Sequence, residues 1–459
     1  MRLSHGAAMG FHRVVRAASI PAACLLWVMT ACLATPAAAI GLLRDPDIEM
    51  SLTRLSAPIL QAAGLNPKRV RVLIVDDGSL NAFVIDNQTI FVHYGLINRA
   101  DTPEQLQAVI AHEAAHISNG HIARRMSNLK SARTVSGLGL ALAVAAAAAG
   151  AGGDAAAGLA FGTSSSALRS FLAHTRAEEA SADQSAARYL RSAGVNPQGL
   201  VDLHEIFRGQ EVLSQGRQDP YMRSHPLTTD RIRAAKAYVA ANGNNAQTSA
   251  EDAYFYARMR GKLTAFTRSP SWTLRRAGSE PYPDVRLMRE AVAHHRNSNL
   301  RAALKAIDGA LAIRPGDPYY LDLKGQILLE SRQTSAAVAA YAQAAKGAPS
   351  EPLILGAYGR ALLADGQPRA ALTQLEAART RDFRDARVLR DLGQAYAETG
   401  QNGMASLAVA ERYALQGRMK DAGYHAERAS GLLPRGSPPW QRAQDVAVAA
   451  EQYEKRSNR

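Results

Sequence analysis

The alternation of apolar and polar residues predicts a small β-sheet near the start of the chain. Apolar side chains recur at alternate positions in residues 70–74, and β-branched, aromatic and other apolar residues fill 82–85 and 89–93, with turn residues between these stretches. A helix is expected before the sheet, because Asp45-Pro46-Asp47 supplies an N-cap, a proline at the first helical position and an early acid. Helical patterns dominate the rest of the chain, so the sequence predicts a mainly α fold.

The C-terminal third repeats with a period of 34 residues. Gly325, Gly359 and Gly393 mark this period, and Pro349 closes the first clear unit. Small residues where two helices cross, with a proline after the second helix, are typical of tetratricopeptide repeats. We expect about four repeats, including a degenerate first unit and a last pair in residues 410–434 that is out of phase. The repeats predict an α-solenoid with an extended concave face.

The first 39 residues resemble a targeting segment. Three arginines flank the start of an apolar stretch, residues 17–33, and Ala37-Ala38-Ala39 offers a small-x-small cleavage site. We therefore predict a cleaved signal peptide, with an uncleaved N-terminal anchor as the alternative. Lipidation at Cys32 is not expected, because the residues before it fit a lipobox poorly. Both cysteines lie in this segment, so the mature chain has none and suits an oxidising compartment without a disulfide framework.

Composition and charge narrow the classes of function. Hydrophobic residues make up 47% of the chain and charged residues 20%, which is ordinary for a globular protein. The formal net charge is +14, of which the signal-peptide arginines supply three. No basic run with interleaved aromatic residues is present, so nucleic acid is not an expected partner. The positive charge favours acidic polypeptides or a membrane surface as partners.

Residues 135–161 form an unusual stretch that is rich in alanine, glycine and leucine and carries one charge, Asp154. A transmembrane helix needs about 20 apolar residues, but glycines come early in this run, at 137 and 139, and residues 150–154 interrupt it again. We expect a pair of short helices packed on the neighbouring domain. The alternatives are a surface that contacts a membrane or an unfolded substrate, and a true membrane span.

The strongest chemical signal is an H-E-x-x-H pentad at residues 112–116. A helix is expected from Pro103, capped by Thr102, to Met126. In such a helix His112 and His116 stack on one face and can fill two tetrahedral positions of a zinc ion, while Glu113 can accept a proton from a metal-bound water. The pentad alone is a moderate signal, because an alanine-rich helix can also carry two structural histidines.

A zinc site needs a third protein ligand, and a downstream helix at residues 176–193 supplies candidates. Glu179 and Asp183 are four residues apart and share one face of that helix, so one carboxylate can bind the metal while the other accepts the free ring N–H of a liganding histidine. A solvated helix face is the alternative. Glu178 points elsewhere and is expected either at the surface or as secondary support of the site. His121 and His204 are expected to pack without binding metal.

These residues together resemble the M48 zinc peptidases. The resemblance rests on the HEAAH pentad, on Arg-x-x-Glu-x-x-x-Asp at 176–183, on Asn81-Ala82-Phe83 upstream and on Ser224-His225-Pro226 downstream. It implies a zincin-like metallopeptidase domain with a small β-sheet. It also implies the role of each site residue: metal ligands His112, His116 and Glu179; general base Glu113; Asp183 as the acid that holds a liganding histidine; His225 as a histidine that can occupy the fourth metal position; Arg231 as an arginine near the site. A catalytic role is the alternative for His225 and is also open to Arg231, since either could donate a hydrogen bond to the tetrahedral oxyanion.

The resemblance also implies a function. Together with the export signal and the C-terminal repeats, it implies a periplasmic zinc-dependent endopeptidase with one Zn²⁺ per chain, also chaperone-like, in the quality control and assembly of outer-membrane proteins. The expected partners are unfolded or misassembled outer-membrane proteins and, through the repeats, the assembly machinery. The alternatives are a non-proteolytic chaperone or adaptor with a structural metal site, and a membrane-embedded protease. The predicted organisation is a signal peptide (1–39), a zinc metallopeptidase domain (40–245), a linker (246–285) and a repeat domain (286–455).

Overall fold

The computed structural model describes residues 41–125, 175–214, 217–242 and 247–457. The predicted signal peptide and the apolar stretch 135–161 lie outside these residues. Among the helices that the structure describes, none combines the length and the apolar character that a membrane span requires.

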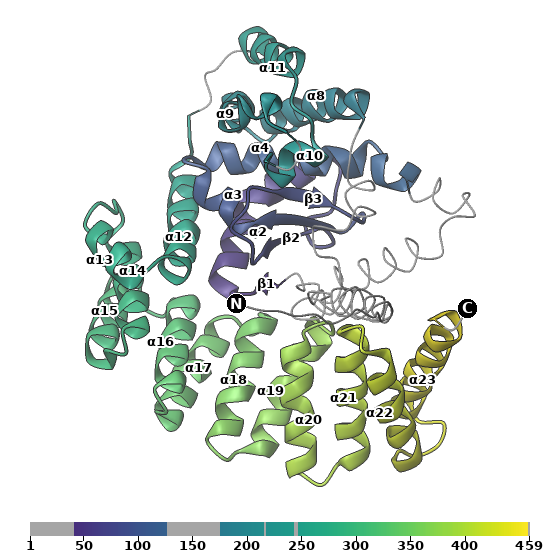
Figure 1. Cartoon of the computed structure of the whole chain (residues 1–459). Coiled ribbons are helices and arrows are strands. Elements are labelled where there is room, and N and C mark those ends of the chain that lie inside the picture. The colour runs from purple at the N-terminus through teal and green to yellow at the C-terminus, as the bar shows by residue number, and fades with distance from the viewer. Residues whose placement is uncertain (1–40, 126–174, 215–216, 243–246, 458–459) are drawn as a thin grey trace, which may run out of the picture. The chain divides into compact units, whose positions relative to one another are not determined.

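The first part of the described chain is helical apart from one small sheet (Figure 1). Its elements are β1 (Leu42–Leu43), α2 (Pro46–Ala62), β2 (Arg71–Val75), β3 (Ala82–Val84), β4 (Thr89–His93), α3 (Tyr94–Arg99), α4 (Pro103–Ser118), α8 (Arg176–Ser192), α9 (Gln198–Phe207), η2 (Gln210–Val212), α10 (Pro220–Ser224) and α11 (Thr229–Asn242). The three predicted strands and the helix capped by Asp45 are confirmed. The two-residue β1 was not predicted, because so short a strand leaves no periodic pattern.

The sheet is mixed, with the strand order β1-β2-β4-β3. β2 and β4 run parallel at its centre, and β1 and β3 pair antiparallel at its two edges. Alternate residues of the central strands, such as Ile74 and Ile90, join residues of α2, α4, α8 and α9 in one hydrophobic core. This core fixes α4, the helix of the pentad, between the sheet and α8.

The pentad helix begins as predicted and ends earlier than predicted. Thr102 caps α4, since its side chain accepts the N–H of Gln105, and Pro103 is the first helical residue. The expected continuation to Met126 is wrong: α4 ends at Ser118, because Gly120 adopts a left-handed conformation (φ 71°) and donates its N–H to the Ile117 carbonyl. The chain turns there and resumes as a separate helical stretch at residues 121–125.

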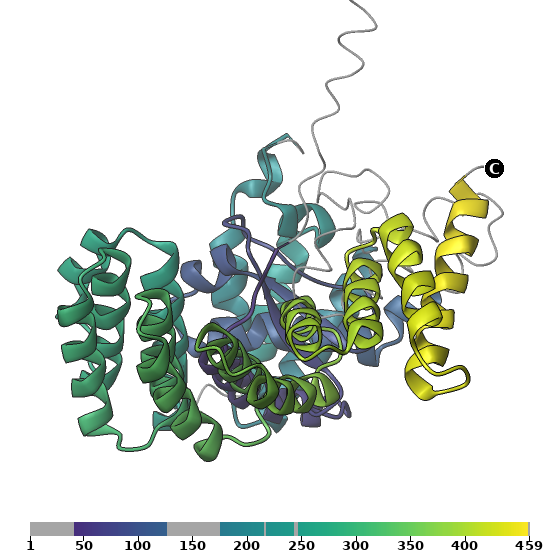
Figure 2. The same cartoon turned by 90° about the horizontal axis from the view of Figure 1, so that it is seen from below.

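The second part of the described chain is entirely helical (Figures 1 and 2). Its elements are α12 (Ala250–Thr267), α13 (Pro270–Ala277), α14 (Pro283–Arg296), α15 (Leu300–Ile313), α16 (Pro318–Glu330), α17 (Thr334–Gly347), α18 (Pro352–Ala364), α19 (Pro368–Arg381), α20 (Ala386–Glu398), α21 (Asn402–Leu415), α22 (Met419–Leu432) and α23 (Pro438–Ser457). Met259 and Leu263 of α12 belong to the same core as the sheet. Part of the predicted linker is therefore a buried helix, and the exact domain boundaries stay a prediction.

The predicted helix pairs are present from α14 to α23. The 34-residue period has a packing reason, because each marked glycine lies where two helices cross closely. A Cβ at Gly325 would lie 2.8 Å from the Tyr341 ring, and a Cβ at Gly359 would lie 2.5 Å from Leu375. The out-of-phase alanines of residues 410–434 are also buried, on α21 and on α22, which packs between α21 and α23. The tetratricopeptide-like repeats are confirmed.

A buried charge cluster joins α12 to α2 and to the start of α16. Arg258 is 2% exposed; its Nε lies 2.6 Å from Asp47 Oδ1, and its other guanidinium nitrogens lie 2.7 and 2.8 Å from the Asp317 carboxylate. Lys262 Nζ lies 2.8 Å from Asp45 Oδ2. We call these residues, with the buried carboxyl of Asp322, the α12 cluster.

Candidate metal centre

His112 and His116 lie on the buried face of α4 and converge. Both are fully buried, and their Nε2 atoms are 3.1 Å apart. Two imidazole nitrogens this close repel each other unless a proton or another cation lies between them. The helical spacing of the pentad therefore creates the predicted pair of ligand atoms.

Glu179 reaches the same point from α8. Thr175 and Glu178 form a capping box that starts this helix, so Glu178 has a local structural role. Glu179 lies next to it and is fully buried, with one carboxylate oxygen 3.4 Å from His112 Nε2 and the other 3.4 Å from His116 Nε2. The solvated-face alternative for Glu179 is wrong in this structure.

The geometry of these three side chains fits a zinc ion. Zn–N and Zn–O bonds are about 2.0–2.1 Å, so two atoms at tetrahedral positions lie about 3.3 Å apart. The two imidazole nitrogens lie 3.1 Å apart, and each lies 3.4 Å from one of the two carboxylate oxygens of Glu179. An oxygen and two imidazole nitrogens are also ligands that zinc accepts. The donor set is therefore that of a metal centre.

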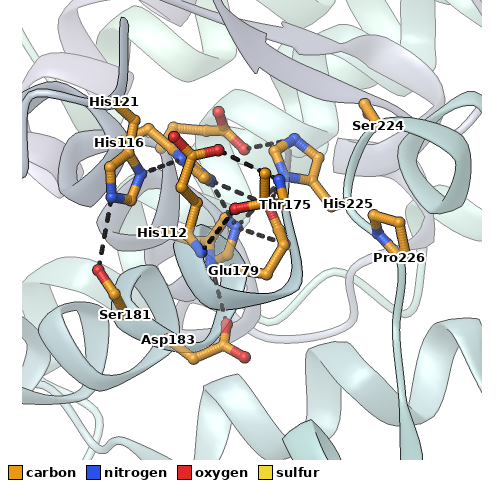
Figure 3. A network of polar contacts seen from close by, with 12 residues as sticks. His112, His116, His121, Thr175, Glu179, Ser181, Asp183, Ser224, His225 and Pro226 are labelled. Atoms are coloured by element: carbon orange, nitrogen blue, oxygen red, sulfur yellow. Dashed lines mark hydrogen bonds and ion pairs between the residues drawn. The ribbon is translucent and has the colours of Figure 1, made fainter. Parts of the chain in front are cut away.

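His225 completes a group of four convergent side chains that could hold a metal ion. It follows α10, and its Nδ1 lies 3.4 Å from His112 Nε2 and 3.0 Å from Glu179 Oε1 (Figure 3). One ligand atom from each of the four residues lies within 4.8 Å of the others. Its other ring nitrogen, Nε2, lies 3.4 Å from Glu113 Oε1. His225 thus stands between the metal position and the acid expected to act as base.

Asp183 and Arg231 hold these ligands in place. Asp183 Oδ1 lies 2.9 Å from His112 Nδ1, which orients that ring with Nε2 toward the centre. Arg231 donates to both oxygens of Asp183, at 2.7 and 2.8 Å, and its Nη1 lies 2.7 Å from Glu179 Oε2. Nη1 also donates to the carbonyls of Pro226, at 2.9 Å, and of His225, at 3.5 Å. Arg231 therefore binds both carboxylates and the turn that carries His225.

Three residues around the centre were not predicted to contribute. His121 Nδ1 lies 2.8 Å from His116 Nδ1, and Ser181 Oγ lies 3.4 Å from the other ring nitrogen of His121. His204 Nε2 lies 3.6 Å from Asp183 Oδ1. The turn at Gly120 was the available signal for His121, since it directs the chain back toward His116.

Burial and neighbouring charges set the protonation of the site. Burial raises the pKa of Glu113, although His225 and His112 lower it. Burial alone would raise the pKa of Glu179, but His225, Arg231 and His112 hold it well below its usual range. Burial also opposes the charge on His112, but Glu179 and Asp183 raise its pKa to about 10. Glu179 is thus held as the anion that a metal ligand must be, and Glu113 is poised to take up a proton.

Comparisons with known proteins agree with this site. Residues 43–239 match the sequence model of the family described as Peptidase family M48. The chain is 24% identical over 404 residues to the beta-barrel assembly-enhancing protease of Escherichia coli (strain K12), a match that covers 86% of this chain and 81% of the relative. It is 25% identical over 407 residues to the protein of the same name from Yersinia pestis, covering 86% and 82%.

Among solved structures, yeast Tom70 is similar at a TM-score of 0.32, with 14% identity and coverage of 79% of this chain and 86% of that chain. The family match spans the described sheet, α4, α8 and the turn of His225, which are the elements that build the centre. Residues 43–239 are therefore an M48 peptidase domain, and tetratricopeptide-like helical repeats follow it.

Proposed function

We propose that the chain is a zinc-dependent endopeptidase of the periplasm that acts on unfolded or misassembled outer-membrane proteins. The observation that carries the peptidase assignment is Glu113, a fully buried acid beside four convergent ligands. A purely structural metal site needs no such base. The signal-peptide pattern supports export, and the name of the Escherichia coli relative supports a role in β-barrel assembly.

The chain's own residues suit peptide hydrolysis. A zinc ion, when bound by His112, His116 and Glu179, supplies a Lewis acid that polarises the scissile carbonyl and acidifies water. Glu113, whose pKa is raised by burial, accepts the proton of the attacking water and passes it to the leaving amine. Asp183 keeps the His112 ring in the liganding orientation. The catalytic role predicted for Arg231 stays a prediction, since its nitrogens already bind Asp183, Glu179 and Pro226.

We further propose that the described conformation is latent. His225 Nδ1 occupies the position that a water or a substrate carbonyl needs. The same segment lies against the edge of the sheet, because Tyr221 of α10 donates its N–H to the Leu80 carbonyl at 3.2 Å, just before β3. An extended substrate would pair with this edge. Moving α10 and its following turn would therefore free the fourth position and uncover β3 in one step.

The four-ligand arrangement also favours a second candidate, a non-proteolytic chaperone with a structural metal site, because structural zinc sites have four protein ligands. Glu113→Gln separates the two. Cleavage of unfolded β-casein should fall by about 10²–10⁴-fold, whereas Glu104→Gln on the same helix should cleave normally. Equal cleavage by the Glu113 variant and the wild type would exclude the proposed mechanism.

His225→Ala tests latency in the same assay. We expect faster cleavage, because the fourth position becomes available, with zinc still held by three ligands. Loss of cleavage with zinc retained would show that His225 assists the reaction, for example by donating a hydrogen bond to the developing oxyanion. Substituting a histidine outside the site, such as His294→Ala, should leave the rate unchanged.

A further inference from the structure

A second cavity lies away from the metal centre, where α12, α13 and α14 meet the turn between α3 and α4. Its volume is about 610 Å³, within the range of about 300–1,000 Å³ typical of ligand sites. Aromatic side chains of three elements line it: Tyr256 of α12, Trp272 of α13 and Tyr282 before α14. Four arginines also line it, so the cavity combines aromatic walls with positive charge.

The four arginines fall into two classes. Arg260 and Arg289 are paired with acids of the same cavity, since Arg260 lies 3.5 Å from Asp101 and Arg289 lies 3.0 Å from Glu280. Within each pair the arginine and the acid neutralise each other, and both pairs form part of the cavity wall.

Arg268 and Arg276 remain. In the described part of the chain neither forms an ion pair with a carboxylate. Both guanidinium carbons lie over the Trp272 ring, at 5.9 and 4.9 Å from its centroid. The one ring thus contacts both cations, and both line the cavity and are exposed. The cavity therefore presents two preorganised positive charges without a countercharge.

We propose that this cavity binds an acidic segment of a polypeptide. Carboxylates of the segment would pair with Arg268 and Arg276, and its apolar groups would contact Trp272. The planar guanidinium group matches a carboxylate with two parallel hydrogen bonds, and stacking on an aromatic ring keeps it oriented. Aromatic walls with a few charged groups also suit a peptide better than a bare ion. The net positive charge, +14 for the full sequence and +11 without the three arginines of the predicted signal peptide, favours the approach of such a segment.

The site is separate from the metal centre and does not depend on the peptidase proposal. It does touch the peptidase domain, since Pro103, the first residue of α4, lines it. A polypeptide bound there would rest on α12 to α14, between the peptidase domain and the repeats.

Calorimetry on the full mature chain tests this site, in a Glu113→Gln background that keeps the probe intact. The probe is a capped peptide of alternating glutamate and alanine, and its glutamine counterpart is the control ligand. Arg268→Gln/Arg276→Gln should raise the Kd of the acidic peptide at least about tenfold. Arg301→Gln/Arg369→Gln, a charge-matched pair exposed on α15 and α19, should leave it unchanged.

Equal Kd values for the two double variants would overturn the proposal, as would equal binding of the acidic and glutamine peptides. Inorganic phosphate and phosphatidylglycerol vesicles are measured in parallel. Binding of either one through Arg268 and Arg276, without binding of the acidic peptide, would also overturn it. Circular dichroism of each variant establishes that the helices are intact.

Discussion

The metal centre and the α12 cluster are both buried sets of ionisable side chains, and they differ in where their polar atoms point. In the α12 cluster the cations stand between the acids: Arg258 bridges Asp47 and Asp317, and Lys262 pairs with Asp45. In the metal centre, ligand atoms of His112, His116, Glu179 and His225 face one another across a common point. The first arrangement is held by ion pairs within the chain, whereas the second calls for an added cation.

The difference distinguishes buried charges that hold the fold together from buried charges that form a binding site. Breaking a buried ion pair is costly, because a desolvated charge is left without its partner, so such pairs hold elements together. The Nε2–Nε2 distance of 3.1 Å in the metal centre has no equivalent in the α12 cluster. We infer that the α12 cluster fixes α12 and the repeats on α2, and that the metal centre is stabilised by its ion.

Arg258→Met should break the α12 cluster with the largest effect on stability. The change leaves the buried Asp47 carboxylate without its closest cation, so the free energy of unfolding should fall by about 3–5 kcal/mol. Urea denaturation measures this loss, and zinc content per folded chain should not change. Arg301→Met, at an exposed position, should shift stability by about 0.5 kcal/mol or less. A similar small shift for Arg258→Met would remove the structural role of the cluster.

His121→Ala should weaken the metal centre without unfolding the chain. His121 holds the Nδ1 side of the His116 ring at 2.8 Å, and loss of such a partner typically costs about 10–100-fold in metal affinity. Competition with a chromophoric zinc chelator measures the affinity, and His121→Gln, which keeps a hydrogen-bonding group, should restore part of it. An unchanged zinc affinity in the alanine variant would mean that His121 only packs there.

Asp322→Asn should change the pH dependence of stability modestly. Burial, reinforced by Asp45 and Asp47 against Lys262, raises the pKa of Asp322 to about 8. A carboxyl whose pKa is raised on folding binds more protons in the folded state, so its contribution to stability is lost as pH rises through about 8. The wild type should therefore lose more thermal stability between pH 6 and pH 9 than the asparagine variant. Parallel pH profiles for the two proteins would contradict this.

The ligands on α4 and α8 were predictable from the sequence because local rules place them. Helical spacing puts His112 and His116 on one face, and the cap at Thr175 sets the phase of Glu179. The repeats were predictable for the same reason, because small residues recur at a fixed spacing wherever two helices cross.

The supporting residues were not predictable in this way. His204 reaches Asp183 only through the packing of α9 on the pentad helix, and no spacing in the sequence reports that contact. Arg258 and its acids are separated by up to 211 positions along the chain, so the α12 cluster exists only in the tertiary fold. The early end of α4 depends on the left-handed backbone conformation of one glycine, Gly120. The helical pattern of apolar residues does not report that conformation.

The most direct test of the central claim measures zinc content and cleavage together. We expect close to one zinc per chain and active cleavage of unfolded β-casein for the wild type. We expect the same zinc content without cleavage for Glu113→Gln, and neither zinc nor cleavage for Glu179→Gln. Cleavage by the wild type with no bound metal, or cleavage that survives in Glu113→Gln, would contradict a catalytic zinc centre at these residues.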